Sequence, residues 1–133
     1  MRRRTFVTLT AAATVALYLP ELDCRPKASR FTRIISQPGA LEHICDVQSI
    51  RQIGDAYQKQ ASNEASESEL TRLLATDTNG SKITESSDST SIASYLDKRV
   101  RDDFKQDKTV VVDGWVLSLT EARQCALFSL TTK

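Results

Sequence analysis

The side chains most able to perform covalent or metal chemistry are one histidine and three cysteines. His43 is the only histidine of the 133-residue chain, and Cys45 follows two positions later. These two fall short of the four ligands that a structural zinc site needs. Residues two apart on a helix also do not face each other, as a Cys–His nucleophile pair must. The sequence therefore predicts no metal site, no cofactor and no catalytic pair among these residues.

The cysteines leave the redox state of the protein open. Cys45 and Cys125 can form a disulfide in an oxidising compartment if the helices that carry them pack together. Two buried free thiols are the other interpretation, because a reduced cysteine behaves as a small hydrophobic residue.

Three polar residues near the C-terminus are the best candidates for an enzyme's site. Asp113, Glu121 and Arg123 lie within eleven positions of one another. Each also suits a structural role, in a tight turn, a helix cap and an ion pair respectively. The chain has no glycine-rich phosphate loop, Cys-x-x-Cys pair or haem-attachment motif. We therefore favour a non-enzymatic protein and keep a free-standing enzyme as the alternative.

The charge distribution argues against nucleic-acid binding. The net charge is +1, from 18 basic and 17 acidic residues, but three of the basic ones are Arg2, Arg3 and Arg4. The rest of the chain has more acidic than basic residues and lacks the positive surface that binds phosphates.

A basic start and an uncharged run occupy the first 19 residues. The run has the length of a signal-peptide hydrophobic region and is too short for a membrane span. Arg3, Arg4 and Phe6, with Val7 next, resemble the twin-arginine export signature. This resemblance implies that residues 1–24 are an export signal or a membrane tether, with the twin-arginine translocase as a partner. The protein is then periplasmic, or membrane-tethered and facing the periplasm.

Cys24 is the residue that lipidation would modify, since it follows the apolar run. Asp23 stands where a lipobox has a small residue. The sequence leaves open whether the signal is cleaved, lipidated at Cys24 or retained.

Residues 25–133 have the pattern of one small, mostly helical domain. A short helix is expected at 40–45, and a longer one after the capping residue Asp46. A capping box of Ser66 and Glu69 starts the next helix. A fourth covers 91–105, where Asp97 with Arg101, Lys98 with Asp102, and Arg99 with Asp103 have ion-pair spacing on a solvated face.

The segment 76–90 is rich in Ser, Thr and Asp around a single Ile83. It has too little apolar surface to fold by itself, so we expect a mobile loop.

A β-hairpin is predicted at 109–118, because Asp113-Gly114 between two apolar runs is typical of a two-residue turn. The register pairs Val112 with Trp115 and Val111 with Val116. Trp115 and Val112 are expected on the core face. Ser118 then caps a last helix that is apolar nearly all round.

The fold class expected is mostly α with a C-terminal β-hairpin, a small α+β fold whose helices pack around a hairpin–helix unit. Residues 113–123 resemble the end of uncharacterised small exported bacterial proteins. This resemblance brings no known activity with it. Many twin-arginine clients carry redox cofactors or accompany proteins that do. We therefore expect an exported accessory or binding protein, including as a subunit or partner of a periplasmic oxidoreductase.

Overall fold

The computed structural model describes residues 27–132, so the signal residues Arg3, Arg4 and Phe6, and also Cys24, lie outside the described part. The elements in chain order are the helices α1 (Arg30–Ile35), α2 (Val47–Gln60), α3 (Glu67–Ala75) and α4 (Ser89–Lys105), the strands β1 (Thr109–Val112) and β2 (Trp115–Ser118), and the helix α5 (Leu119–Thr131). Two short 3-10 turns, η1 (Leu41–His43) and η2 (Ser62–Glu64), flank α2.

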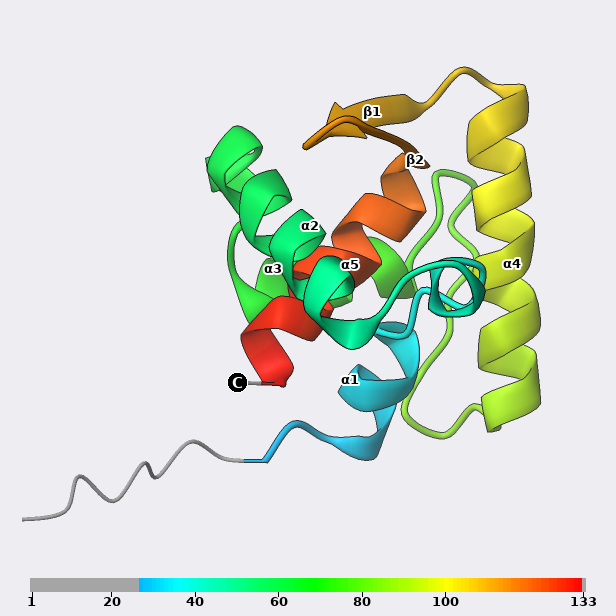
Figure 1. Cartoon of the computed structure of the whole chain (residues 1–133). Coiled ribbons are helices and arrows are strands. Elements are labelled where there is room, and N and C mark those ends of the chain that lie inside the picture. The colour runs from blue at the N-terminus through cyan, green and yellow to red at the C-terminus, as the bar shows by residue number, and fades with distance from the viewer. Residues whose placement is uncertain (1–26, 133) are drawn as a thin grey trace, which may run out of the picture.

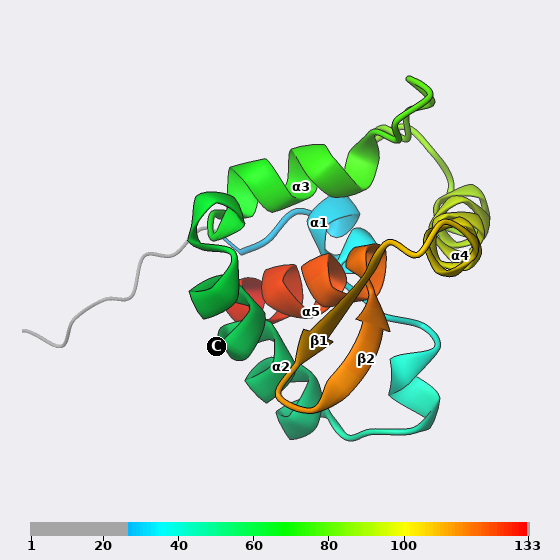
Figure 2. The same ribbon diagram turned by 90° about the horizontal axis from the view of Figure 1, so that it is seen from above.

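The C-terminal helix α5 is the centre of the molecule (Figures 1 and 2). The other four helices and both strands contact it. Most of its side chains are buried, as expected for a helix that is apolar nearly all round. The expectation of a mostly helical domain built around a hairpin–helix unit is confirmed.

The closest helix packing is between α2 and α5, and it depends on Gly54. A Cβ atom on Gly54 would overlap the carbonyl oxygen of Cys125 and lie 2.6 Å from its carbonyl carbon. The predicted stripe of α2 is buried around this point, including Ile50, Ile53 and Tyr57. Glycine therefore lets the two backbones approach to a distance that a side chain would prevent.

Two acidic side chains hold the start of α5. The Ser118 hydroxyl accepts a hydrogen bond from the Glu121 backbone N–H at 3.0 Å, and Glu121 accepts one from the Ser118 N–H at 2.9 Å, which confirms the capping box. Asp103 of α4 accepts hydrogen bonds from the Thr120 N–H and hydroxyl at 2.8 and 2.6 Å. Together they satisfy N–H groups that a helix start leaves without partners.

Only one of the three ion pairs expected along α4 forms among the described residues, between Lys98 and Asp102 at 2.7 Å. The Arg99 guanidinium instead donates to the carbonyl oxygens of Leu73 and Leu74, at the end of α3. Asp103 caps α5. The interpretation of Arg99 and Asp103 as part of a solvated face was wrong. Each side chain instead forms hydrogen bonds with free backbone groups at the end of a neighbouring helix.

The hairpin has the expected register, with Val111 opposite Val116 and Val112 opposite Trp115. Asp113 and Gly114 both have positive φ, at 50° and 82°, as the two-residue turn requires. Val112 is buried and Val116 exposed, in line with the alternation. Trp115 departs from the prediction with 37% exposure, whereas its cross-strand partner Val112 is fully buried.

The segment 76–90 follows a defined path. Asp77 accepts hydrogen bonds from the backbone of Asn79 and Ser81, Thr76 pairs with Lys82 in an isolated bridge, and Ile83 is buried. The first residues of α4 also lie within this range. The mobility of the remainder stays a prediction.

The N-terminal part of the described chain differs from the expectation at two points. Residues 40–45 form only the single 3-10 turn η1, followed by a loop. The apolar stretch before Pro38, for which no element was predicted, forms the helix α1, with Phe31 and Ile35 buried. No helix within residues 27–132 is long and apolar enough to cross a membrane.

Candidate functional site

A cavity of about 740 Å³ lies between α1, the segment around η1, the outer helix α4 and the first turns of α5. Its volume is within the range of roughly 300–1,000 Å³ that is usual for small-molecule sites. Ile34 of α1 and Ala93, Leu96 and Val100 of α4 provide an apolar wall. These elements meet because α1 and α4 contact each other as well as α5.

Glu121 and Gln124 form the polar floor of this cavity, one turn apart on α5. Glu121 is 6% exposed and Gln124 is 2% exposed. The Gln124 amide nitrogen donates to the carbonyl oxygens of Ile35 and Gln37 at 3.1 and 2.8 Å, which ties the end of α1 to α5. Residues at positions i and i+3 share a helix face, so both side chains project to the same side.

One oxygen of each floor side chain remains unused. Glu121 Oε2 accepts the Ser118 N–H, but no donor among residues 27–132 reaches Glu121 Oε1 or Gln124 Oε1. Neither atom is sealed from solvent, because every sealed side-chain oxygen or nitrogen of the described residues has a partner. Both residues that carry these unused acceptor oxygens line the cavity.

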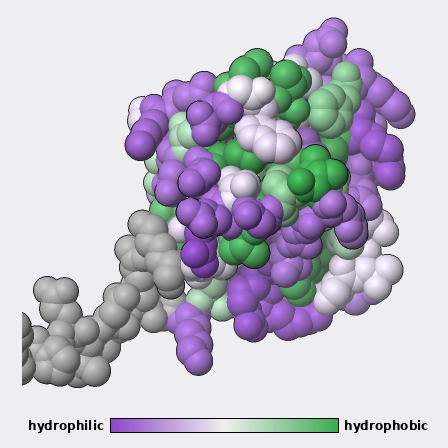
Figure 3. Space-filling view, viewed as in Figure 1, coloured by the Kyte–Doolittle hydropathy of each residue, from purple (hydrophilic) through white to green (hydrophobic). Residues whose placement is uncertain are grey.

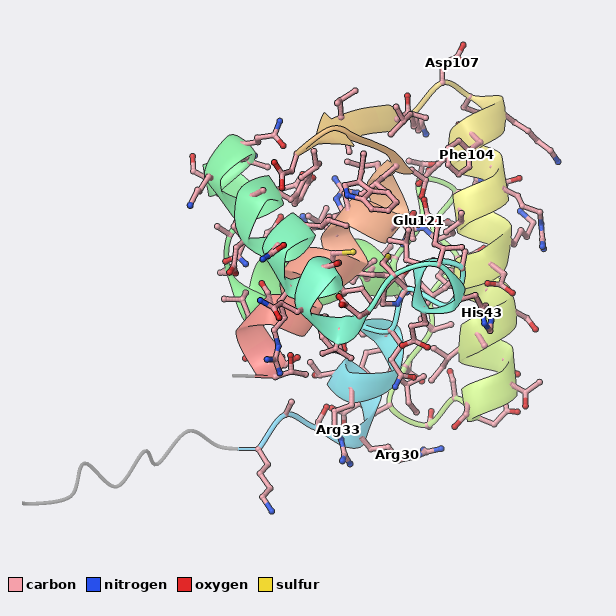
Figure 4. All side chains as sticks on the ribbon, in the orientation of Figure 1. Arg30, Arg33, His43, Phe104, Asp107 and Glu121 are labelled. Carbon is pink, nitrogen blue, oxygen red and sulfur yellow. The ribbon has the colours of Figure 1, made fainter. Side chains whose placement is uncertain are left out.

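Four exposed charged or titratable side chains surround the mouth of the cavity: Glu42, His43, Asp97 and Arg101. Figure 4 shows Glu121 where α5 begins, on the side towards α4. Among the described residues no Lys or Arg forms an ion pair with Glu121. The lining has three acidic residues, Glu42, Asp97 and Glu121, and one arginine, Arg101.

The three polar residues singled out in the sequence are not brought together. Glu121 lines the cavity, whereas Arg123 forms an ion pair with Glu64. Asp113 occupies the hairpin turn and borders a separate shallow hollow beside α2. The structure therefore gives no support to a joint catalytic site of these residues.

Arg123 belongs to a cluster between α2, η2 and α5. Its guanidinium donates two hydrogen bonds to the Glu64 carboxylate, at 2.8 and 2.9 Å, and the Tyr57 hydroxyl donates a third at 2.8 Å. The hydrogen bonds from Arg123 hold the pKa of Glu64 below its ordinary value. Burial, and then the bond to Glu64, raises the pKa of Tyr57 to about 12. The cluster links three elements, as expected for an ion-pair role of Arg123.

His43 and the two described cysteines form no common site. His43 is exposed at the cavity mouth, and the Cys45 thiol donates to the Leu41 carbonyl oxygen at 3.2 Å. Cys45 and Cys125 are both free thiols, and burial raises the pKa of each. Within residues 27–132 no three His, Cys, Asp or Glu side chains are grouped as metal ligands.

The outer side of the hairpin is a second feature that points to binding. Val111 and Val116 are cross-strand partners with 58% and 63% exposure. Trp115, on the opposite face of the hairpin from this pair, is 37% exposed, and Phe104, at the end of α4 beside the strands, is 46% exposed (Figure 4). Hydrophobic side chains gather over the hairpin in the space-filling view (Figure 3). We call the exposed cross-strand pair of Val111 and Val116 the hairpin surface.

Sequence reasoning missed Gln124 and the residues of α4 that complete the cavity. A signal for Gln124 was present, since it is a polar residue in the most apolar part of the last helix, three positions after Glu121. Asp97 and Arg101 gave none, because their spacing equally suits a solvated helix face.

Comparisons with protein-family models, with curated proteins and with solved structures found no match to this chain.

Proposed function

We propose that this chain is an exported accessory protein that binds a protein partner through the hairpin surface. The observation that carries the proposal is the exposure of Val111 and Val116, at 58% and 63%, on a two-stranded antiparallel element. Exposed apolar residues that cluster on one element are typical of protein-binding sites, whereas isolated ones need no explanation.

The N-terminal arginine pair supports the location of this partner. Arg3, Arg4 and Phe6 resemble a twin-arginine signal, so the partner is expected in the periplasm or at the membrane facing it. Proteins exported in this way often accompany redox enzymes, and a subunit or partner of a periplasmic oxidoreductase is the class that we propose. No cofactor is assigned to this chain itself.

A charge-neutral double substitution tests the hairpin surface. Val111→Lys with Val116→Glu removes both aliphatic side chains and places opposite charges on a cross-strand pair, which supports the hairpin. The matched control is Ile44→Lys with Val47→Glu, two valine-sized or larger side chains with 67% and 53% exposure elsewhere on the surface. Glu is also favourable at Val47, in the first turn of α2.

The measurement is affinity capture of the full-length chain from the periplasmic fraction, with identification of captured proteins and absorbance spectra of the captured complex. We expect one partner with the wild-type chain and with the control, and none with the hairpin variant, at similar melting temperatures. Capture of the same partner by the hairpin variant would contradict the proposed surface.

A further inference from the structure

We propose that the cavity between α1, α4 and α5 binds a small aliphatic organic cation, such as an alkylammonium ion. Its ammonium group would donate hydrogen bonds to Glu121 Oε1 and Gln124 Oε1, and its hydrocarbon chain would lie along the apolar wall of α4. This proposal concerns a different surface from the hairpin and does not depend on the partner proposed above.

The first argument is the state of the Glu121 carboxylate. The Glu121 residue is only 6% exposed, and a carboxylate with so little access to water is stabilised by a cation placed beside it. Glu121 has one backbone hydrogen bond, from Ser118, and no ion pair among residues 27–132. A bound cation would supply the charge that the described protein does not.

The second argument is the number and kind of unused polar atoms. Glu121 Oε1 and Gln124 Oε1 are both acceptors, and they belong to residues three positions apart on one helix that line the same cavity. The matching ligand group therefore has at least two N–H donors. An ammonium group has three donors and no acceptor, which fits such a pair.

The third argument selects an aliphatic ligand with a single charged end. The helices α1 and α4 contribute the hydrocarbon side chains of Ile34, Leu96 and Val100 to the lining. The acidic rim residues Glu42 and Asp97 would attract a cation from solution, and Arg101 opposes them only in part. An anion would meet the carboxylate of Glu121 at the cavity floor.

Three probes of equal length separate the contribution of the positive charge from that of the hydrocarbon chain. They are pentylammonium, pentan-1-ol and pentanoate. Binding to the ¹⁵N-labelled full-length chain is followed by amide chemical shifts. We expect saturable shifts around Glu121, Gln124 and Leu96 with pentylammonium, at about tenfold lower concentration than with the alcohol, as for a hydrogen bond to a charged group. Tighter binding of pentanoate, or no saturable shift with pentylammonium, would overturn the proposal.

The variant Glu121→Gln and its control Glu67→Gln test whether the ligand binds in the cavity. Glu121→Gln keeps a residue that can complete the capping box but removes the charge, so affinity for pentylammonium should fall about tenfold. Glu67→Gln, the same change on exposed α3, should leave it unaltered.

Ala93→Trp keeps the test decisive if Glu121→Gln does not fold. Ala93 is exposed on α4 and lines the cavity, so an indole there would fill the space without disturbing the buried core. Binding should then be lost while the melting temperature stays near that of the wild type. Undiminished binding to folded Ala93→Trp would place the ligand elsewhere and refute the proposed site.

Discussion

At the scale of single residues, Gly54 shows how one missing side chain sets the distance between two helices. Its α-carbon faces the backbone of α5 at Cys125 and Ala126, so any Cβ would meet backbone atoms, which cannot rotate away as a flexible side chain can. Relief requires α2 to move away from α5, and that separation would loosen the core on both sides of the contact.

Gly54→Ala should therefore lower the free energy of unfolding by about 3 kcal/mol, the upper range for overpacking, although alanine favours helices. The measurement is urea unfolding followed by circular dichroism. Gly39→Ala is the control, because a Cβ at Gly39 meets nothing within 4 Å. A stability loss at Gly54 no greater than at Gly39 would contradict the close packing.

The ion pair of Glu64 and Arg123 gives the fold a dependence on acid. The folded state lowers the pKa of Glu64, so the pair stabilises the fold fully above the ordinary carboxyl value of 4.5. This contribution is lost as the pH falls through the lower pKa of the folded state.

Glu64→Gln should cost about 2 kcal/mol at neutral pH, because the two side chains are only 13% and 16% exposed and Arg123 loses its charged partner. The cost should shrink as the pH falls below 4.5, where the wild-type carboxylate becomes protonated. Urea unfolding of both proteins from neutral to acidic pH measures this. A stability difference that does not change with pH would disprove the coupling.

At the scale of elements, the helix α4 shows where local patterns stop being informative. Its spacing correctly predicts a helix and the exposed pair of Lys98 with Asp102. Arg99 and Asp103 have the same spacing, yet each reaches the end of a neighbouring helix. The free carbonyls of α3 and free N–H groups of α5 are strong partners for charged side chains, and only the tertiary fold brings them within reach.

The hairpin shows a similar limit, since alternation gave the correct face for Trp115 but not its depth. Trp115 is 37% exposed, whereas Leu117 on the same face is 2% exposed. Trp115→Ala should therefore cost about 1–2 kcal/mol, and Leu117→Ala about 2–5 kcal/mol. Thermal unfolding compares the two. Tryptophan emission should be readily quenched in the free protein; a larger cost at Trp115, with quencher-resistant emission, would indicate a core residue.

At the scale of the whole molecule, the fold class followed from periodicity, caps and the turn, because these are local properties of the chain. The cavity did not follow, since it needs α1, α4 and α5 to be placed in three dimensions. The short helix α1 was not foreseen either: six residues give too little periodicity to distinguish a helix from a strand. The sequence identified Glu121 as a helix cap. Its second carboxylate oxygen becomes a candidate ligand atom only when the fold places α4 across the cavity.

The export of the whole molecule is the last property that can be tested from particular residues. The twin-arginine route requires the guanidinium groups themselves, while a general secretory signal needs only positive charge before its apolar run. Changing Arg3 and Arg4 to lysine keeps the charge and removes both guanidinium groups. The full-length double variant should therefore remain in the cytoplasm, with Arg2→Lys, outside the pair, exported as the wild type. Cell fractionation and immunoblotting provide the measurement. Undiminished export of the double variant would exclude the twin-arginine route, and a cytoplasmic wild-type protein would exclude export and the periplasmic partner with it.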